Sequence, residues 1–181
     1  MPKIVDHDAY REEIASKAVD VFRRRGYAGI GMRELAQELA MSKSALYHYF
    51  PSKESLFLAC SKNVASFSLD PSLDPATSIV KLAQQWEEVF PGEMRIMLDY
   101  IGERSPAQVK DDEALQLTIR GFEQSLSSVV DQSLVAPILS SVFGFLLLRY
   151  IDGHSAPWSE LRKLVTSVLP SPQSPRELGG D

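Results

Sequence analysis

The side chains best suited to binding chemistry lie close together just after residue 41. Ser42 is a good N-cap for a helix that runs on to Tyr49, and Lys43, Ser44 and Ala45 follow it. Short and polar side chains at the exposed start of a helix permit a close approach, and a recognition helix meets the base edges of DNA at this end. The pattern therefore predicts hydrogen bonding and ion pairing to DNA, and no bond-making reaction.

Three helices are needed to position that edge. A helix that starts after Gly31 has one apolar stripe at positions i, i+3, i+4 and i+7, formed by Met32, Leu35, Ala36 and Leu39. A longer helix before it begins after Asp8, ends at Gly26, and has an apolar face formed by Ile14, Ala18, Val21 and Phe22. We expect a three-helix head, in which a sharp turn at Ala40 leads into the exposed helix and Leu46 points inward.

The stretches Met32–Ala36 and Met41–Glu54 resemble the DNA-binding signature of the tetracycline-repressor (TetR) family of bacterial transcription regulators. The resemblance covers roughly residues 10–57, about a quarter of the chain, and its closing aromatic-Phe-x-x-Lys run is specific. It implies an all-α fold, with an N-terminal three-helix helix-turn-helix DNA-binding domain and a C-terminal helical-bundle domain for ligand binding and dimerisation. It also implies DNA contacts from Arg33, Lys43, Ser44, Ala45, Tyr47, Tyr49 and Lys53.

Several residues near this signature have a competing structural interpretation. Phe50 fits an ordinary core aromatic, whereas the hydroxyl of Tyr47 fits a phosphate contact better. Lys53 starts the next helix, where the helix dipole disfavours a cation, so a phosphate explains it better than helix stability does. The Arg23–Arg25 run fits a solvated helix end. Ala40 stands where the family usually has glycine, and a positive φ there would cost about 1 kcal/mol.

Charge is unevenly distributed along the chain. Residues 1–62 carry ten Lys/Arg against eight Asp/Glu, a net charge of +2, whereas residues 63–181 carry nine against sixteen, a net charge of −7. An acidic protein, with a formal net charge of −5, therefore has a slightly basic N-terminal part. Overall acidity does not exclude DNA binding.

The composition favours a cytoplasmic protein without catalytic or metal chemistry. The first residues lack the basic and then apolar pattern of a signal peptide, and Cys60, the only cysteine, can form no intrachain disulfide. We find no Gly-rich phosphate loop, no clustered Cys/His spacing and no nucleophile elbow, and the three histidines are scattered. We therefore expect no catalytic residue, no metal site and no cofactor.

The rest of the chain shows helical periodicity throughout. We expect a helix from Lys53 that is long enough to bridge two domains, followed by helices at 75–88, 92–103, 111–131, 134–151 and 157–169. The expected domains are a helix-turn-helix domain at 1–52, a ligand-binding and dimerisation domain at 53–169, and a flexible Pro-, Gly- and Ser-rich tail at 170–181.

The segment 134–151 is apolar on nearly every side, so part of it must be covered by a partner. Paired with 157–169, it predicts a four-helix contact across a two-fold axis and hence a homodimer. The predicted contact residues are Val135, Leu139, Val142, Phe143, Leu146, Tyr150, Trp158, Leu161 and Val165. The alternatives are a buried central helix of a monomer and a membrane span, and Pro137 and Arg149 argue against the span.

Aromatic residues and methionines between residues 86 and 122 suit an apolar cavity. The resemblance assigns these helices to an effector pocket, and the candidate lining residues are Trp86, Phe90, Met94, Met97, Tyr100, Arg120 and Phe122. Ordinary core packing explains the same residues equally well, because periodicity does not separate a cavity lining from a core.

These features predict a homodimeric transcriptional regulator, a repressor that a small and partly apolar effector releases from palindromic operator DNA, with no membrane partner. One alternative is an architectural DNA-binding dimer without effector response, which predicts little sequence preference and a steep loss of affinity with salt. Another is a helical-bundle enzyme, for which the sequence offers no acid, base or nucleophile constellation.

Overall fold

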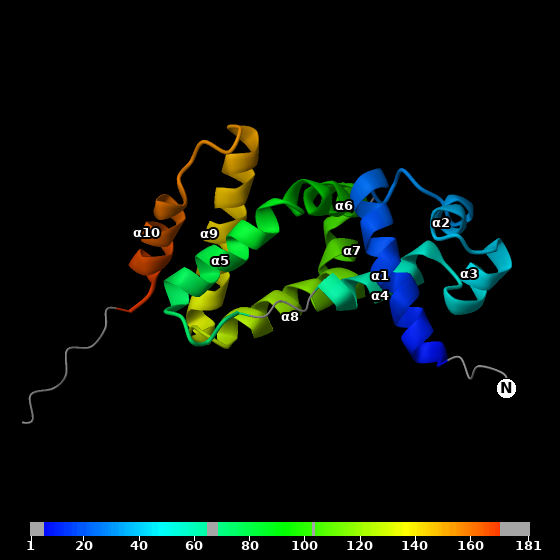
Figure 1. The fold of residues 1–181 in the computed structure, drawn as a ribbon, viewed down its shortest axis with the longest axis horizontal. Helices are drawn as coiled ribbons and strands as arrows, with labels where there is room; N and C mark the ends of the chain where they lie inside the picture. The colour runs from blue at the N-terminus through cyan, green and yellow to red at the C-terminus, as the bar shows by residue number, and fades with distance from the viewer. Residues whose placement is uncertain (1–5, 65–68, 103, 171–181) are drawn as a thin grey trace, which may run out of the picture.

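The computed structural model describes residues 6–64, 69–102 and 104–170, and every regular element within them is a helix (Figure 1). The helices are α1 (His7–Arg25), α2 (Met32–Glu38), α3 (Lys43–Tyr49), α4 (Lys53–Val64), α5 (Pro75–Glu87), α6 (Phe90–Gly102), α7 (Pro106–Lys110), α8 (Glu113–Ser127), α9 (Gln132–Ile151) and α10 (Trp158–Val168). The predicted all-α class is confirmed. The predicted tail at 170–181 lies, apart from Pro170, outside the described residues.

α1, α2 and α3 form a head at one end of the molecule (Figure 1). The carboxylate of Asp6 accepts hydrogen bonds from two backbone N–H groups in the first turn of α1 and caps that helix. Gly26 ends α1 with a φ of 76°, a left-handed conformation that glycine adopts without steric cost. The predicted apolar faces meet in the head core, which contains Ile14, Ala18, Val21, Phe22, Leu35, Ala36, Leu46 and Phe50.

α4 belongs to the head core and also reaches the rest of the molecule. Leu56 and Cys60 are buried in the core of the head, and α4 packs against both α1 and α8. The same core takes in Tyr100 of α6 and Ala114 of α8. The predicted domain boundary after residue 52 thus precedes a helix that packs on both sides, and the division into two domains remains a prediction.

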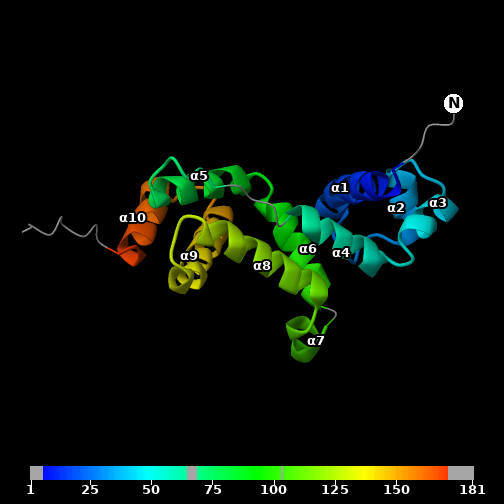
Figure 2. The same cartoon turned by 90° about the horizontal axis from the view of Figure 1, so that it is seen from below.

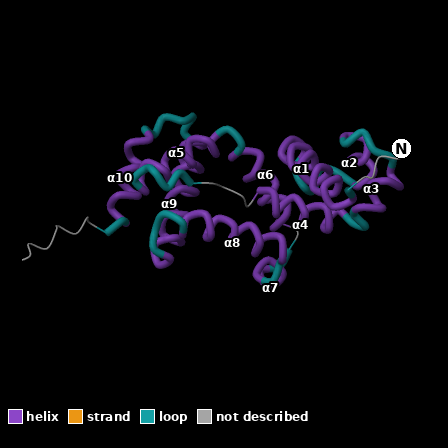
Figure 3. The backbone as a smooth tube through the Cα atoms, turned by 60° about the horizontal axis from the view of Figure 1, so that its bottom comes forward, coloured by secondary structure: helices purple, strands orange, loops and turns teal. Residues whose placement is uncertain are grey.

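α5, α9 and α10 form the far end of the molecule, and α6 and α8 lie between that end and the head (Figures 1 and 2). Figure 3 shows α8 running between the two ends. The far end has its own core, in which α5, α8, α9 and α10 contribute Ile79, Trp86, Phe122, Leu126, Ile138, Leu146, Leu161 and Val165. The molecule therefore has two cores, with α6 and α8 contributing residues to each.

The helix predicted at 111–131 corresponds to α8, and the short α7 lies before it, between the helices predicted at 92–103 and 111–131. Pro106 opens α7, and Ser105 caps it with Gln108 in a capping box. Asp112 then caps α8, because its carboxylate accepts hydrogen bonds from two backbone N–H groups of the first turn. The prediction missed α7 because a helix of five residues is too short to show an apolar period.

The predicted dimer contact on α9 and α10 needs a correction. Five of its residues, Val135, Val142, Leu146, Leu161 and Val165, are buried within the single chain. Trp158 is half-buried with its ring 5.5 Å from that of Phe145, and Leu139 and Phe143 line an internal cavity. Of the residues predicted for the contact, Tyr150 alone is exposed.

The exposed arc of α9 carries Leu147, Leu148 and Ile151, and Leu164 is exposed on α10. Sequence periodicity did not identify this arc because α9 is apolar on all sides, so only the packing of α5, α8 and α10 decides which side is covered. By length and composition α9 is also able to cross a membrane, and 33% of that stretch is buried inside the structure.

Candidate nucleic-acid interface and ligand cavity

The start of α3 is exposed and firmly held. The hydroxyl of Ser42 accepts a hydrogen bond from the backbone N–H of Ala45 at 3.1 Å, and the hydroxyl of Ser44 lies 3.1 Å from it. Ser42, Lys43 and Ser44 are exposed, and Ala45 is half-buried. Leu46 is fully buried on the opposite side. The helix therefore presents a small, polar edge on a rigid support, as the sequence predicts.

The turn before α3 has the strained geometry that the sequence pattern suggests. Ala40 has a φ of 54°, a left-handed conformation that a side chain disfavours. The turn closes through backbone hydrogen bonds from Ala40 to Gln37 at 3.0 Å and from Met41 to Ala36 at 2.8 Å. These bonds tie the turn to the end of α2 in spite of the strain.

Arg33 and Tyr47 are two further predicted DNA contacts that are exposed. Arg33 lies on α2 and is exposed, and the Tyr47 side chain is 40% exposed on α3. The Lys43 ammonium lies 5.6 Å from the centre of the Tyr47 ring. The Lys43 ammonium and the hydroxyls of Tyr47, Ser42 and Ser44 can together donate several hydrogen bonds to a phosphate or to a base edge.

Tyr49 is less free than its neighbours. It is half-buried, its hydroxyl shares a hydrogen bond with Nδ1 of His7 at 3.2 Å, and its ring meets that of Tyr10 edge-on at 5.2 Å. Arg11 also donates a hydrogen bond to the backbone carbonyl of Tyr49 at 2.8 Å. Tyr49 thus ties the end of α3 to α1, and any contact with DNA would be made beside that anchor.

Lys53 has a structural role that the sequence does not reveal. Its ammonium donates hydrogen bonds to the backbone carbonyls of Tyr27 at 3.0 Å and Ile30 at 3.3 Å, and it lies 4.1 Å from the centre of the Tyr27 ring. The side chain therefore satisfies carbonyls of the loop between α1 and α2. This arrangement does not support the phosphate contact that the sequence favours for Lys53.

Arg24 and Arg25 are exposed, in agreement with the solvated helix end that the sequence suggests, but all three arginines of the run also form ion pairs. Arg24 and Arg25 each form an ion pair with Glu38 of α2 at 3.3 Å. Arg23 points to the other side, where its Nε lies 2.6 Å from a carboxylate oxygen of Glu93 on α6. The end of α1 is consequently joined to α2 on one side and to α6 on the other.

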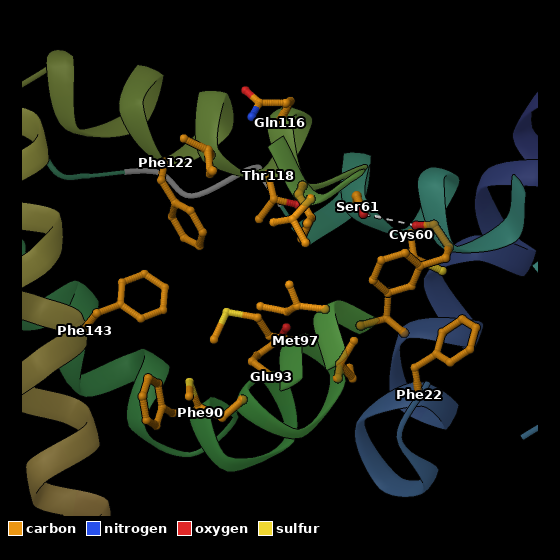
Figure 4. Close-up of a pocket in the computed structure, with 18 of the residues that line it drawn as sticks. Phe22, Cys60, Ser61, Phe90, Glu93, Met97, Gln116, Thr118, Phe122 and Phe143 are labelled. Carbon is orange, nitrogen blue, oxygen red and sulfur yellow. Dashed lines mark hydrogen bonds between the residues drawn. The ribbon is translucent and has the colours of Figure 1, made fainter. Parts of the chain in front are cut away.

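A cavity of about 340 Å³ lies between the head and the far end, with walls from α1, α4, α5, α6, α7, α8 and α9 (Figure 4). Five of the predicted ligand residues line it, namely Trp86, Phe90, Met94, Met97 and Phe122. Residues that the sequence analysis did not assign to a pocket complete the apolar wall, among them Phe22, Phe57, Leu139 and Phe143. Cys60 also lines the cavity, where burial raises the pKa of its thiol to about 12 and makes it a poor nucleophile.

Tyr100 and Arg120 do not line this cavity, and both predictions are corrected. Tyr100 is buried in the head core, where its ring stacks on Phe57 with centres 4.2 Å apart and its hydroxyl donates to Asp112 at 2.9 Å. Burial, and then the hydrogen bond to Asp112, raise the pKa of Tyr100. Arg120 is exposed on α8, because two residues along a helix turn the side chain by about 200° from Phe122.

Sequence comparisons match the N-terminal part of the chain. Residues 14–60 match the family described as bacterial regulatory proteins, tetR family. The HTH-type transcriptional regulator PksA of Bacillus subtilis (strain 168) is 38% identical over 64 residues, which are 35% of this chain and 31% of PksA. The HTH-type transcriptional repressor AcnR of Corynebacterium diphtheriae is 38% identical over 56 residues, 31% of this chain and 30% of AcnR. The chain thus spans less than a third of the length of these relatives.

Structural comparisons match the whole fold. A member of the TetR family from Streptomyces coelicolor A3 has a TM-score of 0.68 at 17% identity, covering 89% of this chain and 98% of that one. The multidrug binding protein EbrR complexed with imidazole has a TM-score of 0.67 at 17% identity, covering 92% and 93% of the two chains. EbrR complexed with ethidium gives a TM-score of 0.67 at 16% identity. The arrangement of head, connecting helices and far end is therefore a known fold.

Proposed function

We propose that this chain, which through residues 14–60 belongs to the TetR family of bacterial regulatory proteins, is a homodimeric repressor that a small molecule releases from a palindromic operator. One observation carries the proposal. The start of α3 is exposed and polar, while Leu46 on the same helix is fully buried, so the edge that would enter a major groove is free and rigidly held. As a DNA-binding regulator, it would act in the cytoplasm.

Charge supports this assignment of the head. Residues 1–62 have a net charge of +2 in a chain of net charge −5. Glu38 of α2 is paired with Arg24 and Arg25, whereas the ammonium of Lys43 lies at the exposed edge. Cationic groups at the exposed edge favour phosphate contacts, and the acidic remainder keeps the body of the protein away from the DNA.

A second copy of the chain is the expected occupant of the exposed arc of α9. Small residues, Ala136, Ser140 and Gly144, lie one turn apart along that arc and continue into Leu147 and Ile151. A Cβ added at Gly144 would meet no atom within 4 Å, so a second backbone has room to approach. A two-fold dimer also brings two recognition helices to half-sites about 34 Å apart.

The cavity supports effector-controlled binding over a purely architectural role. Its volume falls within the range of about 300 to 1,000 Å³ that is usual for small-molecule sites. Its walls include Phe22 and Val19 of α1, so a ligand there would touch the helix that carries the head. An effector would lower DNA affinity to the extent that it prefers the conformation that misfits the operator.

Selection of duplexes from a random pool at fixed salt tests the proposal. We expect a palindromic consensus bound by a dimer, followed by release of that duplex when a cavity ligand is added. Binding without sequence preference, with a steep salt dependence and no release by any small molecule, would favour the architectural alternative.

A further inference from the structure

Glu93 is the one acidic side chain among the described residues that line the cavity. It projects from α6 and is surrounded by apolar lining residues, including Met97 and Phe90 (Figure 4). Its side chain is 18% exposed. A carboxylate in such apolar surroundings needs a cationic partner, because an unpaired buried charge is strongly unfavourable.

The hydroxyl groups of the cavity also present acceptors. Ser61 donates its proton to the carbonyl of Phe57 at 3.1 Å, and Thr118 donates its proton to the carbonyl of Ala114 at 2.9 Å. Because both hydroxyl protons are already donated, these two oxygens can only accept hydrogen bonds from a ligand. Gln116 donates one N–H to the carbonyl of Lys110 at 3.0 Å. Lys110 itself is exposed on α7, so the interior of the cavity favours a ligand that carries donors or a positive charge.

The present partner of Glu93 comes from the head. Arg23 of α1 reaches it at 2.6 Å but is not itself a lining residue. Arg23 also lies 3.2 Å from Asp20, which is exposed on the same helix. The guanidinium of Arg23 therefore keeps a carboxylate within reach when Glu93 is engaged by another cation.

The contact between α1 and α6 around this ion pair is close. A Cβ at Gly92 would lie 3.1 Å from the Cβ of Arg23, and Arg95 of α6 donates a hydrogen bond to the carbonyl of Arg24 at 3.2 Å. Arg24 is in turn paired with Glu38 of α2. Two adjacent residues of α1, Arg23 and Arg24, thus connect Glu93 of α6 to α2, the first helix of the helix-turn-helix.

We propose that the cavity takes an organic cation with an apolar aromatic body, and that its positive group replaces Arg23 as the partner of Glu93. The inference rests on the proposed effector function of the cavity and adds the ligand class and the point of coupling. Loss of the bond from Arg23 to Glu93 removes the ion pair among the contacts that hold the end of α1 to α6, so the cation prefers a conformation in which the head has shifted.

Three fluorescent probes that share the acridine ring and differ in charge test the ligand class in the full-length protein. They are N-methylacridinium, a cation, acridine, which is neutral at pH 7.5, and acridine-9-carboxylate, an anion. We expect the affinity for the cation to exceed those for the other two by about tenfold or more, as for a hydrogen-bonded charge pair. Equal affinities for all three, or no binding of the cation, would overturn the inference.

Two variants test the coupling, with circular dichroism as the check of folding. In Glu93→Gln the cation should lose about tenfold in affinity while neutral acridine stays within about twofold. In Arg23→Gln the affinity for the cation should instead rise, because Glu93 loses its competing partner. A merely structural ion pair would weaken binding of every probe in both variants. Glu123→Gln, on α8 outside the cavity lining, is the matched control.

The duplex selected above separates this inference from the proposed function. Release of that duplex by the cation in the wild type but not in Glu93→Gln supports both. Release by all three probes alike, unchanged in Glu93→Gln, leaves the regulator function intact and overturns the inference. If no duplex is bound at all, the regulator function fails, and the order of probe affinities still decides whether the cavity selects cations.

Discussion

Ala40 is the clearest case of strain at a single residue, because its φ of 54° lies in the region that glycine adopts more easily. We expect Ala40→Gly to stabilise the protein by roughly 1 kcal/mol, because glycine adopts this φ without strain. The larger conformational entropy of glycine in the unfolded chain reduces this gain. Urea denaturation measures the change. Ser16→Gly in the exposed middle of α1 is the control and should be destabilising by roughly 0.5 kcal/mol, because serine has the higher helix propensity. A loss of stability in both variants would contradict a strained turn.

The exposed edge of α3 should divide into residues that position the DNA and residues that read it. Tyr47→Phe removes a hydroxyl suited to a phosphate, so affinity should fall by about two- to tenfold for all duplexes alike. Lys43→Gln should instead change which base is preferred at one position, a difference of about 1 to 3 kcal/mol. Titration of the selected operator and its single-base variants at one salt concentration distinguishes the two. Uniform losses in both variants would refute the division.

Substitution of Lys53 distinguishes a structural role of this lysine from a contact with DNA. Lys53→Met removes two hydrogen bonds to the carbonyls of Tyr27 and Ile30, so we expect a loss of about 1 to 3 kcal/mol in unfolding free energy. The salt dependence of DNA binding should be unchanged in this variant, whereas a phosphate contact contributes a slope of about one. A slope reduced by about one in Lys53→Met would restore the phosphate contact that the sequence favours.

At the scale of elements, Glu87 joins α5 to the end of α9 and to the loop that follows it. Its carboxylate accepts hydrogen bonds from Arg149 at 2.7 Å and from His154 at 2.8 Å. Arg149 also donates to the carbonyl of Ala156 and lies 4.5 Å from the centre of the Trp158 ring. Burial acts to raise the pKa of Glu87, but the bonds from Arg149 and His154 outweigh it and lower that pKa below its ordinary value of 4.5.

A carboxyl whose pKa is lowered by folding stabilises the folded state above its ordinary pKa, and the effect is lost as the pH falls through the folded value. Glu87→Gln should therefore cost about 1.5 to 3 kcal/mol at pH 7 and progressively less below pH 4.5. Thermal melts of the wild type and the variant from pH 7 to pH 3 measure the difference. Glu88→Gln, at the neighbouring exposed position, should have little effect at any pH. A Glu87→Gln deficit that stayed constant with pH would exclude this role of the carboxylate.

At the scale of the whole molecule, the exposed arc of α9 is the surface on which the dimer depends. Ile151 is 70% exposed and Leu148 is 62% exposed. Exposed apolar side chains that gather on one helix are typical of a surface that binds a partner. We expect Ile151→Asp to shift the protein toward monomer and to weaken operator binding by more than about tenfold, because both half-sites must then be bound independently. Sedimentation velocity and duplex titration measure the two effects.

Leu98→Asp provides the matched control for the dimer experiment. Leu98 is 60% exposed on α6 and belongs neither to α9 nor to the lining of the cavity. This variant should remain dimeric and bind the operator normally. A dimeric Ile151→Asp protein would mean that the copies meet elsewhere.

The candidate sites differ in how far they could be predicted. Ser42 was recognisable as a cap because its bond to the backbone of Ala45 spans three residues and leaves a local sequence signal. The two carbonyls held by Lys53 lie 26 and 23 residues away, and no local pattern indicates them. Trp86 and Phe122 were predicted correctly as cavity residues because aromatic side chains suit an apolar cavity. Tyr100 is also aromatic, but it packs in the head core.

Helices, caps and the recognition edge follow from contacts three or four residues apart, so the order of amino acids was sufficient to predict them. Which arc of α9 is covered, which aromatic residues enclose the cavity, and which acid meets Arg23 depend on helices that are distant in sequence. These contacts form only when α5, α6, α8 and α10 pack against α1 and α9. Because an apolar side chain gains similar free energy in any well-packed environment, residue type alone did not determine its neighbours.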